Sequence, residues 1–225
     1  MALWCAIVTV GPGDESEQLA GSEPQWQEAH RVDALLPSIG GAVSLMVAKH
    51  PAEKRASFVG ALLRADRDPV VVAEIDIALP AERWEIRASG LWADHVCETA
   101  LEHWSYGLEA FALEIEDPSE LLGKGLGLRV PLGWELEFEA EQVAGWLGSC
   151  CYQQVGELHG LILTVDGESA VEGPAVRTHW WGLGGPVELH VGRGHRPVQT
   201  RVRLPSRRGI WQLAAGENGL RVSCS

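Results

Sequence analysis

Apolar and polar side chains alternate with a period of two along several stretches of this chain. The run from Trp134 to Glu139 has Trp, Leu and Phe at alternate positions, with a glutamate after each of them. The same alternation runs through residues 73–79 and 111–116. Because successive side chains of a β-strand point to opposite faces of a sheet, these stretches predict strands with one apolar, inward face and one acidic, outward face. In the last stretch the pattern assigns Phe111 to the apolar face.

Further stretches with strand-like composition follow one another along the chain, separated by turn-forming sequences such as Ser89-Gly90 and Asp166-Gly167. Strands are predicted at 41–48, 57–65, 70–79, 83–89, 91–99, 104–116, 132–140, 151–165, 186–191, 198–204, 209–214 and 219–224. The first ten residues also favour a strand. Two helices are predicted, an amphipathic one at 23–36 and a short one that begins at Asp117 and ends before Gly123. Many short strands with few helices indicate an all-β, antiparallel barrel or sandwich.

The charge of the chain restricts its partners. The formal net charge of −13 over 225 residues argues against binding to nucleic acid or to an anionic membrane surface, since both require basic patches. Acidic residues gather at 98–141 and basic ones after residue 190, which indicates solvated strand faces, or two faces that meet within the chain or across a homodimer. No stretch is long and apolar enough to span a bilayer, and the N-terminus does not read as a signal peptide. We therefore expect a cytoplasmic protein.

Several kinds of cofactor site are not predicted. The five cysteines and eight histidines lack metal-ligand spacing, so we expect no metal and free thiols. Gly-rich stretches such as 182–185 do not form a phosphate loop between a strand and a helix, which argues against a nucleotide cofactor.

Proton-transfer groups and aromatic residues concentrate in the segment 102–111. As a strand, it would place His103 and Glu109 on one face and Trp104 and Tyr106 on the other. A histidine and a glutamate inside a barrel would be driven toward their neutral forms by desolvation, which suits general acid–base catalysis. The alternative is a structural hydrogen-bonded pair or a solvent-facing strand.

A second cluster, at 173–182, would place Arg177, His179 and Trp181 on one face of a strand. Such a group could bind a carboxylate, polarise a carbonyl or protonate an alkene; it could equally be a buried structural network in which arginine stacks on tryptophan. His159 is in phase with two leucines and is predicted to point inward.

Ten tryptophans are many for this length. They either fill the core or line a cavity for an extended apolar ligand, and Trp104, Trp134, Trp180 and Trp181 are the candidates for the second role.

The runs 84–99, 103–111 and 129–137 carry a family resemblance. They resemble an actinobacterial family that is similar to the hydroxyneurosporene synthase, tocopherol-cyclase-like and lipocalin-type Diels–Alderase superfamily, over roughly residues 40–182. The resemblance implies two packed lipocalin-like lobes, 1–117 and a shortened 118–225, around an apolar cavity. It also implies hydration or cyclisation of isoprenoid or polyketide-like compounds without a redox cofactor. The Arg-Asp-His-Ser-Trp-Gly pattern of such proteins corresponds here to the run from Arg177 to Gly182, in which the acid before the histidine is missing.

Together these observations predict an all-β protein that holds a hydrophobic small molecule. As a cofactor-independent hydratase, cyclase or isomerase it would use His179 as general acid, with Glu109 or Tyr106 as its complement. Binding of the ligand is assigned to Trp104, His103, Trp134, His159, Arg177 and Trp181. The alternatives are a carrier that does not catalyse a reaction and an interaction scaffold whose interior is filled with tryptophan.

Overall fold

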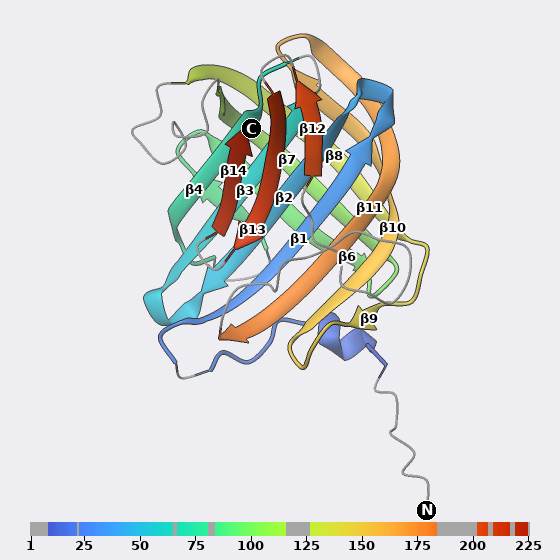
Figure 1. Cartoon of the computed structure of the whole chain (residues 1–225). Helices are drawn as coiled ribbons and strands as arrows, with labels where there is room; N and C mark the ends of the chain where they lie inside the picture. Colours follow the sequence, from blue (N-terminus) through green and yellow to red (C-terminus); the bar gives the residue numbers. More distant parts are fainter. Residues whose placement is uncertain are drawn as a thin grey trace, which may run out of the picture.

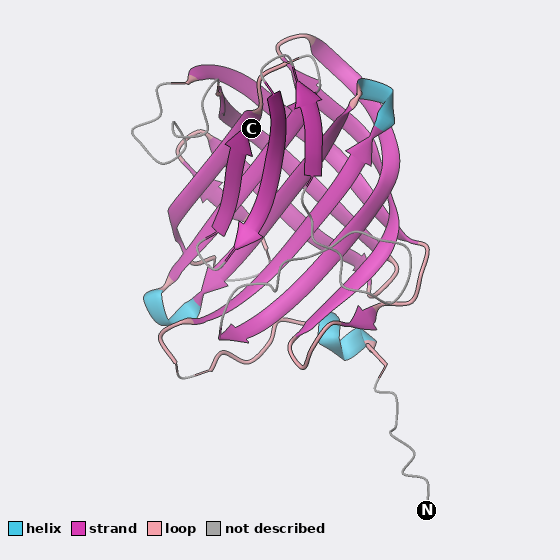
Figure 2. Ribbon diagram, viewed as in Figure 1, coloured by secondary structure: helices cyan, strands magenta, loops and turns pink. Residues whose placement is uncertain are grey.

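The protein consists almost entirely of antiparallel strands (Figure 2). A computed structural model describes residues 9–21, 23–64, 67–80, 84–115 and 127–183, together with the backbone of three strands between residues 202 and 224. The helices of this described part are the single 3-10 turns η1 (Pro12–Glu15), η2 (Pro37–Ile39) and η3 (Pro51–Glu53). None of them is long and apolar enough to cross a membrane. The prediction of an all-β, antiparallel fold is therefore confirmed.

Most of the predicted strands are present, with small differences at their ends. The strands are β1 (Trp26–Leu36), β2 (Gly41–His50), β3 (Arg55–Arg64), β4 (Val70–Ala78), β5 (Ile86–Ala88), β6 (Leu91–Thr99), β7 (His103–Glu114), β8 (Leu128–Ala140), β9 (Gly145–Trp146), β10 (Cys151–Thr164), β11 (Gly167–Leu183), β12 (Val202–Ser206), β13 (Gly209–Gly216) and β14 (Gly219–Cys224).

One large sheet closes on itself (Figure 1). Its strand order is β4-β3-β2-β1-β11-β10-β8-β7-β6-β5, and β4 also pairs with β7 through Val70–Glu114 and Val71–Leu113. This pairing joins β1, β2, β3, β4, β7, β8, β10 and β11 into a closed ring, which we call the ring. The β5–β6 hairpin continues from the edge of β7, and β12, β13 and β14 form a separate sheet in which β12 contacts β2 and β3.

The lobe boundary predicted after residue 117 falls between β7 and β8. These two strands pair along most of their length, from His103–Glu139 to Glu114–Leu128. Both predicted lobes therefore contribute strands to the same ring.

The helix predicted at 23–36 is wrong, because β1 occupies this segment. Side chains on both faces of β1 are buried, and polar residues such as Glu28 and His30 stand at inward positions. These polar residues interrupt the apolar two-residue period that would have indicated a strand. The predicted N-terminal strand, the helix after Asp117 and the strand at 186–191 lie outside the described residues.

The alternation in β8 is confirmed, since Trp134, Leu136 and Phe138 are buried and the glutamates between them are exposed or half-buried. In β7 the assignment of Phe111 to the interior is wrong. Phe111 is 61% exposed and Ala112 is buried. The phase of β7 is set by Trp104, Tyr106 and Leu108, and every second residue from them, including Ala112, faces inward.

Apolar side chains from the inner faces of the strands form one large core inside the ring. Gly60 on β3 illustrates how closely this core is packed. A Cβ at this position would lie 2.8 Å from the Trp134 ring and 3.1 Å from side-chain atoms of both Phe58 and Val72. The absence of a side chain at residue 60 therefore makes room for the indole of Trp134.

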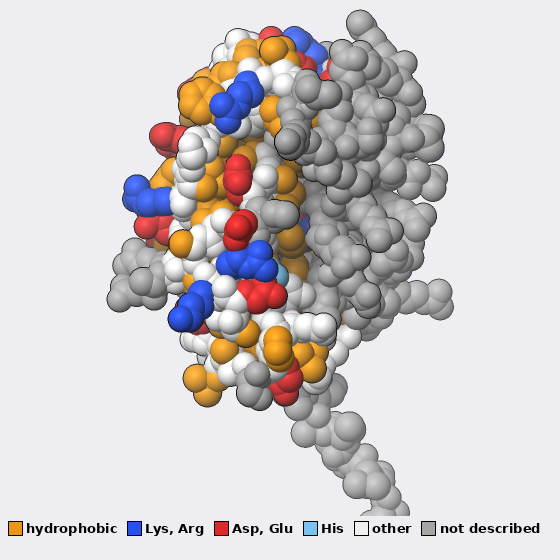
Figure 3. Space-filling model, turned by 90° about the vertical axis from the view of Figure 1, so that its left-hand side faces the viewer, with side chains coloured by type: hydrophobic (Ala, Val, Ile, Leu, Met, Phe, Trp, Pro, Cys, Tyr) orange, Lys and Arg blue, Asp and Glu red, His pale blue; other side chains and the backbone are white. Residues whose placement is uncertain are grey.

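The outer surface carries charges of both signs. On the side drawn in Figure 3, acidic and basic side chains are interspersed with apolar ones over the described part of the chain, and neither sign forms a continuous patch there. The basic segment after residue 190 lies outside the residues whose side chains are described.

Candidate functional site

Polar side chains gather at one end of the ring interior. We call this group the polar cluster; it consists of Glu15, Glu28, His30, Tyr152, Gln154, Arg177 and His179, each at most 6% exposed. Its members come from the first residues of β1 and β10, from the later residues of β11, and from η1, which lies at this end of the ring (Figure 1). The register pairs His30 with His179 and His179 with Tyr152, so these three residues lie side by side on neighbouring strands.

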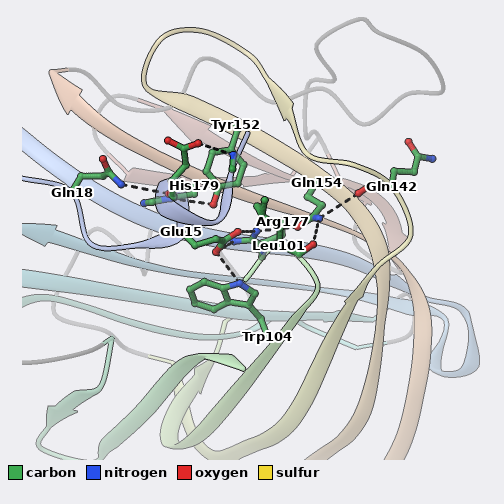
Figure 4. A network of polar contacts seen from close by, with 11 residues as sticks. Glu15, Gln18, Leu101, Trp104, Gln142, Tyr152, Gln154, Arg177 and His179 are labelled. Carbon is green, nitrogen blue, oxygen red and sulfur yellow. Dashed lines mark hydrogen bonds and ion pairs between the residues drawn. The ribbon is translucent and has the colours of Figure 1, made fainter. Parts of the chain in front are cut away.

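Arg177 and Glu15 form the first part of the polar cluster (Figure 4). Both terminal nitrogens of Arg177 donate to the Glu15 carboxylate, with Nη1 at 3.1 Å from Oε2. Trp104 Nε1 donates to the same Oε2 at 3.0 Å, and Arg177 Nη2 also donates to Gln154 Oε1 at 3.0 Å. The guanidinium lies 4.9 Å from the Trp104 ring centroid. These contacts hold η1, which contains Glu15, against the ring interior.

His179 is the centre of the second part (Figure 4). Its Nε2 lies 2.9 Å from Glu28 Oε1 and its Nδ1 lies 3.3 Å from the Tyr152 hydroxyl. The backbone N–H of Gln18 donates to both oxygens of Glu28, at 3.1 Å each. Burial raises the pKa of Tyr152, so that this phenol stays neutral. The acid missing from the sequence next to His179 is thus matched in space by Glu28, which lies 151 residues away in the chain.

His30 lies beside this pair without a polar partner of its own. Its ring stacks on His179 with centroids 3.9 Å apart, and it also contacts Trp84 and Trp104. Within the described part of the chain, neither ring nitrogen of His30 has a hydrogen-bond partner. Burial, followed by the charges of His179 and Arg177, holds the pKa of His30 well below its usual value, so the imidazole is neutral.

A metal ion could be held here, although the sequence predicted none. Glu28, His30 and His179 offer ligand atoms that all lie within 4.8 Å of one another. Glu28 and His30 are two residues apart on β1, but His179 comes from β11, which is distant in the sequence, so no short spacing in the chain reveals the whole set.

Further unpartnered polar atoms face the ring interior beyond the polar cluster. The two ring nitrogens of His95, the hydroxyl of Tyr106 and Nε1 of Trp134 are buried and have no hydrogen-bond partner among the residues that the structure describes. Burial lowers the pKa of His95 to about 3 and raises the pKa of Tyr106, so both side chains are neutral near pH 7. The rings of His95 and Tyr106 meet edge to face, 4.9 Å apart.

The structure brings together several residues that the sequence singled out. Arg177, His179 and Trp181 share one face of β11, as predicted, and Trp181 lies 4.9 Å from His179, ring to ring. Trp104 is connected to Arg177 through Glu15, because both donate hydrogen bonds to the Glu15 carboxylate. Tyr106 lies near Trp104, with ring centroids 6.4 Å apart. Other predicted residues of the interior lie elsewhere: Trp134 is in the apolar core, and Trp180 packs with Ala29 and Ala48 on the opposite face of β11.

Three predicted site residues lie on the outside of the ring. Glu109 is exposed, which separates it from the buried His179. His103 is half-buried, and its Nε2 lies 2.6 Å from Glu137 Oε2. The inward placement of His159 is wrong, because the inner face of β10 is formed by the even-numbered Leu158 and Ile162; His159 lies 3.6 Å from Glu139.

The partners that sequence reasoning missed are Glu15, Glu28, His30, Tyr152 and Gln154. Each is an ordinary polar residue whose role comes from a contact across strands or with η1, so that no motif identifies it. Comparison of the chain with family models, curated proteins and solved structures gave no match. The resemblance to the hydroxyneurosporene synthase superfamily therefore stays a prediction.

Proposed function

We propose that the ring interior binds a hydrophobic small molecule that carries hydroxyl or carbonyl groups, of isoprenoid or polyketide-like kind. The observation that carries this proposal is the set of inward, buried and unpartnered polar atoms on His95, Tyr106 and Trp134. Buried polar groups are nearly always hydrogen-bonded, and leaving one unpaired costs about 1–3 kcal/mol. Three of them within an apolar core favour a ligand that supplies the missing partners.

The chemistry of these atoms limits the ligand. Trp134 Nε1 can only donate a hydrogen bond, whereas the Tyr106 hydroxyl and a neutral His95 can donate or accept. A carbonyl or hydroxyl oxygen suits all three. The surrounding valine, leucine and phenylalanine side chains offer no further polar partner, so the rest of the ligand is expected to be apolar.

The test is a titration followed by tryptophan fluorescence, with farnesol and the hydrocarbon farnesene as one probe pair and emodin as an aromatic polyketide. We expect farnesol or emodin to bind, and the alcohol to bind about 5-fold more tightly than the hydrocarbon, since one neutral hydrogen bond contributes about 1 kcal/mol. Tyr106→Phe should reduce this preference without weakening the binding of farnesene. His103→Gln, on the outer face, is the matched control and should bind like the wild type.

Two results would overturn the proposal. The first is that none of the three probes changes the fluorescence and that native mass spectrometry finds no bound molecule after incubation with isoprenoid and polyketide extracts. The second is an alcohol preference that Tyr106→Phe leaves intact.

Catalysis of a hydration, cyclisation or isomerisation stays a prediction. Glu109 faces away from the interior, so the groups able to move a proton within the ring would be His179 and Glu28.

A further inference from the structure

We propose that Glu28, His30 and His179 form a binding site for a divalent first-row transition metal ion, with Zn²⁺ as the ion to test first. This site lies at the polar end of the ring, and it does not depend on the small-molecule ligand proposed above. Two observations support it independently: the convergence of the three side chains and the state of His30.

The three side chains converge closely enough to share one ion. Their ligand atoms lie within 4.8 Å of one another and all three residues are at most 1% exposed. Ligands about 2.0–2.2 Å from a common zinc ion are separated from one another by roughly 3–4 Å in a tetrahedral arrangement. Because the rings of His30 and His179 are stacked with 15° between their planes, His30 has to turn out of the stack for its in-plane lone pair to reach an ion shared with Glu28 and His179.

His30 has no other polar role in the described structure. It is 1% exposed, both of its ring nitrogens lack a hydrogen bond, and its ring stacks directly on His179. An imidazole nitrogen without a hydrogen bond keeps a lone pair in the plane of the ring, so His30 has a ligand atom available for a metal ion once its ring turns out of the stack with His179.

The positively charged side chains near Glu28 are paired with other carboxylates. Arg177 is paired with Glu15, and Lys49 Nζ lies 2.9 Å from Glu17. No lysine or arginine among the described residues forms an ion pair with Glu28, whose partners are His179 and the backbone N–H of Gln18. A buried carboxylate is costly unless a positive charge lies beside it. A metal ion between the three residues would supply that charge.

The surroundings of the ligands resemble the outer shell of a metal site. The other ring nitrogen of His179 meets the Tyr152 hydroxyl at 3.3 Å, and Gln18 orients the Glu28 carboxylate. Such contacts fix the tautomer and the orientation of ligating side chains. Two imidazoles and one carboxylate favour zinc or iron over magnesium and calcium, which prefer oxygen ligands, and leave a fourth position for water or another oxygen ligand.

The test measures metal content and a spectroscopic signature. Full-length protein is refolded from urea with EDTA, or with ZnCl₂ or CoCl₂, and dialysed before elemental analysis. Refolding gives the ion access to a site that is closed in the folded state. We expect one equivalent of zinc, a visible absorption of four-coordinate Co²⁺, and a melting temperature that EDTA lowers.

The variants separate this site from adventitious binding. His30→Gln should weaken zinc binding by more than about 100-fold, beyond the ~10–100-fold typical of outer-shell changes, and should abolish the cobalt absorption. His95→Gln is the matched control, because His95 is also buried, inward and unpartnered, and it should bind zinc like the wild type. If His30→Gln does not fold, as judged by circular dichroism, Glu28→Gln replaces it with the same expectation.

The proposal is overturned if wild-type protein holds no stoichiometric zinc after refolding, in which case His179 and Glu28 form only the hydrogen-bonded contact described above. It is equally overturned if folded His30→Gln or Glu28→Gln binds zinc as tightly as the wild type. The farnesol and emodin titrations test the proposed function separately, so failure of one proposal is distinguishable from failure of the other.

Discussion

The two ends of the ring interior are built from the same strands but have opposite chemistry. On β1 the inward residues change from Glu28 and His30 to Val32, Ala34 and Leu36 within nine positions. On β11 they change in the reverse direction, from Val171 and Ala175 to Arg177 and His179. Antiparallel pairing places both polar stretches at the same end of the ring.

The two ends gain their stability in different ways. The apolar core is stabilised by burial, roughly 25 cal/mol per Å² of apolar surface, and tolerates changes that preserve its volume. The polar cluster is stabilised only as a complete set, because each buried charge depends on one particular partner. One of these partners, Glu15, lies in η1, outside the ring strands. The stability of the polar cluster therefore depends in part on the N-terminal segment that carries Glu15.

The largest effect is expected where a partner in the polar cluster is removed. Arg177→Met removes the positive charge beside the buried Glu15 carboxylate, which keeps only the Trp104 Nε1 donor, and it removes the donor to Gln154 Oε1. We expect the free energy of unfolding in urea to fall by about 3–5 kcal/mol. The double variant Glu15→Gln/Arg177→Met removes both charges and should recover at least about half of this loss. A double variant no more stable than Arg177→Met would show that packing of the arginine, not its charge, dominates.

A similar truncation in the apolar core should have a smaller and simpler effect. Leu45 on β2 is 0% exposed and belongs to this core. Leu45→Ala should lower the free energy of unfolding by about 3 kcal/mol through lost burial and the cavity that remains. Leu163→Ala, at a position that is 51% exposed, is the control and should change stability by at most about 0.5 kcal/mol. Restoration of stability by any second substitution in the polar cluster would contradict the independence of the two ends.

The difference between the two ends also explains how far the sequence predicts this structure. Strand β8, in the apolar core, shows the two-residue period because glutamates at 135, 137 and 139 face outward and Trp134, Leu136 and Phe138 face inward. Strand β1 does not show it, because Glu28 and His30 face inward and its outward side is covered too. Polar inward residues are the reason that the same segment suggests a helix.

The candidate site was only partly predictable for a related reason. Arg177, His179 and Trp181 are close in sequence, so strand geometry alone places them on one face. Their partners Glu15 and Glu28 come from other elements, and only the register of β1 with β11 and the position of η1 bring them near. His159 shows the converse error, because its phase follows from Leu161 and Leu163, which are themselves exposed. Glu109 was expected inside because of its possible role in proton transfer with His103, although the face opposite Trp104 and Tyr106 is the outer one.

A fall in pH should lower the stability of the folded state through His95, a buried histidine outside the polar cluster. Its pKa is lowered by burial to about 3, whereas in the unfolded chain it is near the ordinary value of 6.5. Between these values the unfolded state binds a proton that the folded state does not. Stability is therefore complete above about pH 6.5 and is lost as the pH falls toward 3, at up to ~1.4 kcal/mol per pH unit.

His95→Gln tests this directly. Between pH 7 and pH 5, the free energy of unfolding in urea should fall by about 2 kcal/mol less in the variant than in the wild type. His30 and Tyr106, which act on or contact His95, are neutral in this range and are retained in the variant. Equal losses in the two proteins would show that His95 is accessible to protons in the folded state.

The smallest effect is expected on the outside of the ring, where the chain has a second histidine–glutamate pair. His103 and Glu137 are in contact at 2.6 Å but are 36% and 39% exposed, whereas His179 and Glu28 are in contact at 2.9 Å and are 0% and 1% exposed. A double-mutant cycle with His103→Asn and Glu137→Gln should give a coupling energy of about 0.2–1 kcal/mol that decreases at ~1 M salt. The same cycle on His179 and Glu28 should give a larger coupling that salt does not change, because water and ions do not reach the pair. Equal coupling in the two pairs would mean that burial adds nothing to the polar cluster, and the contrast between the two ends of the ring would then be one of composition alone.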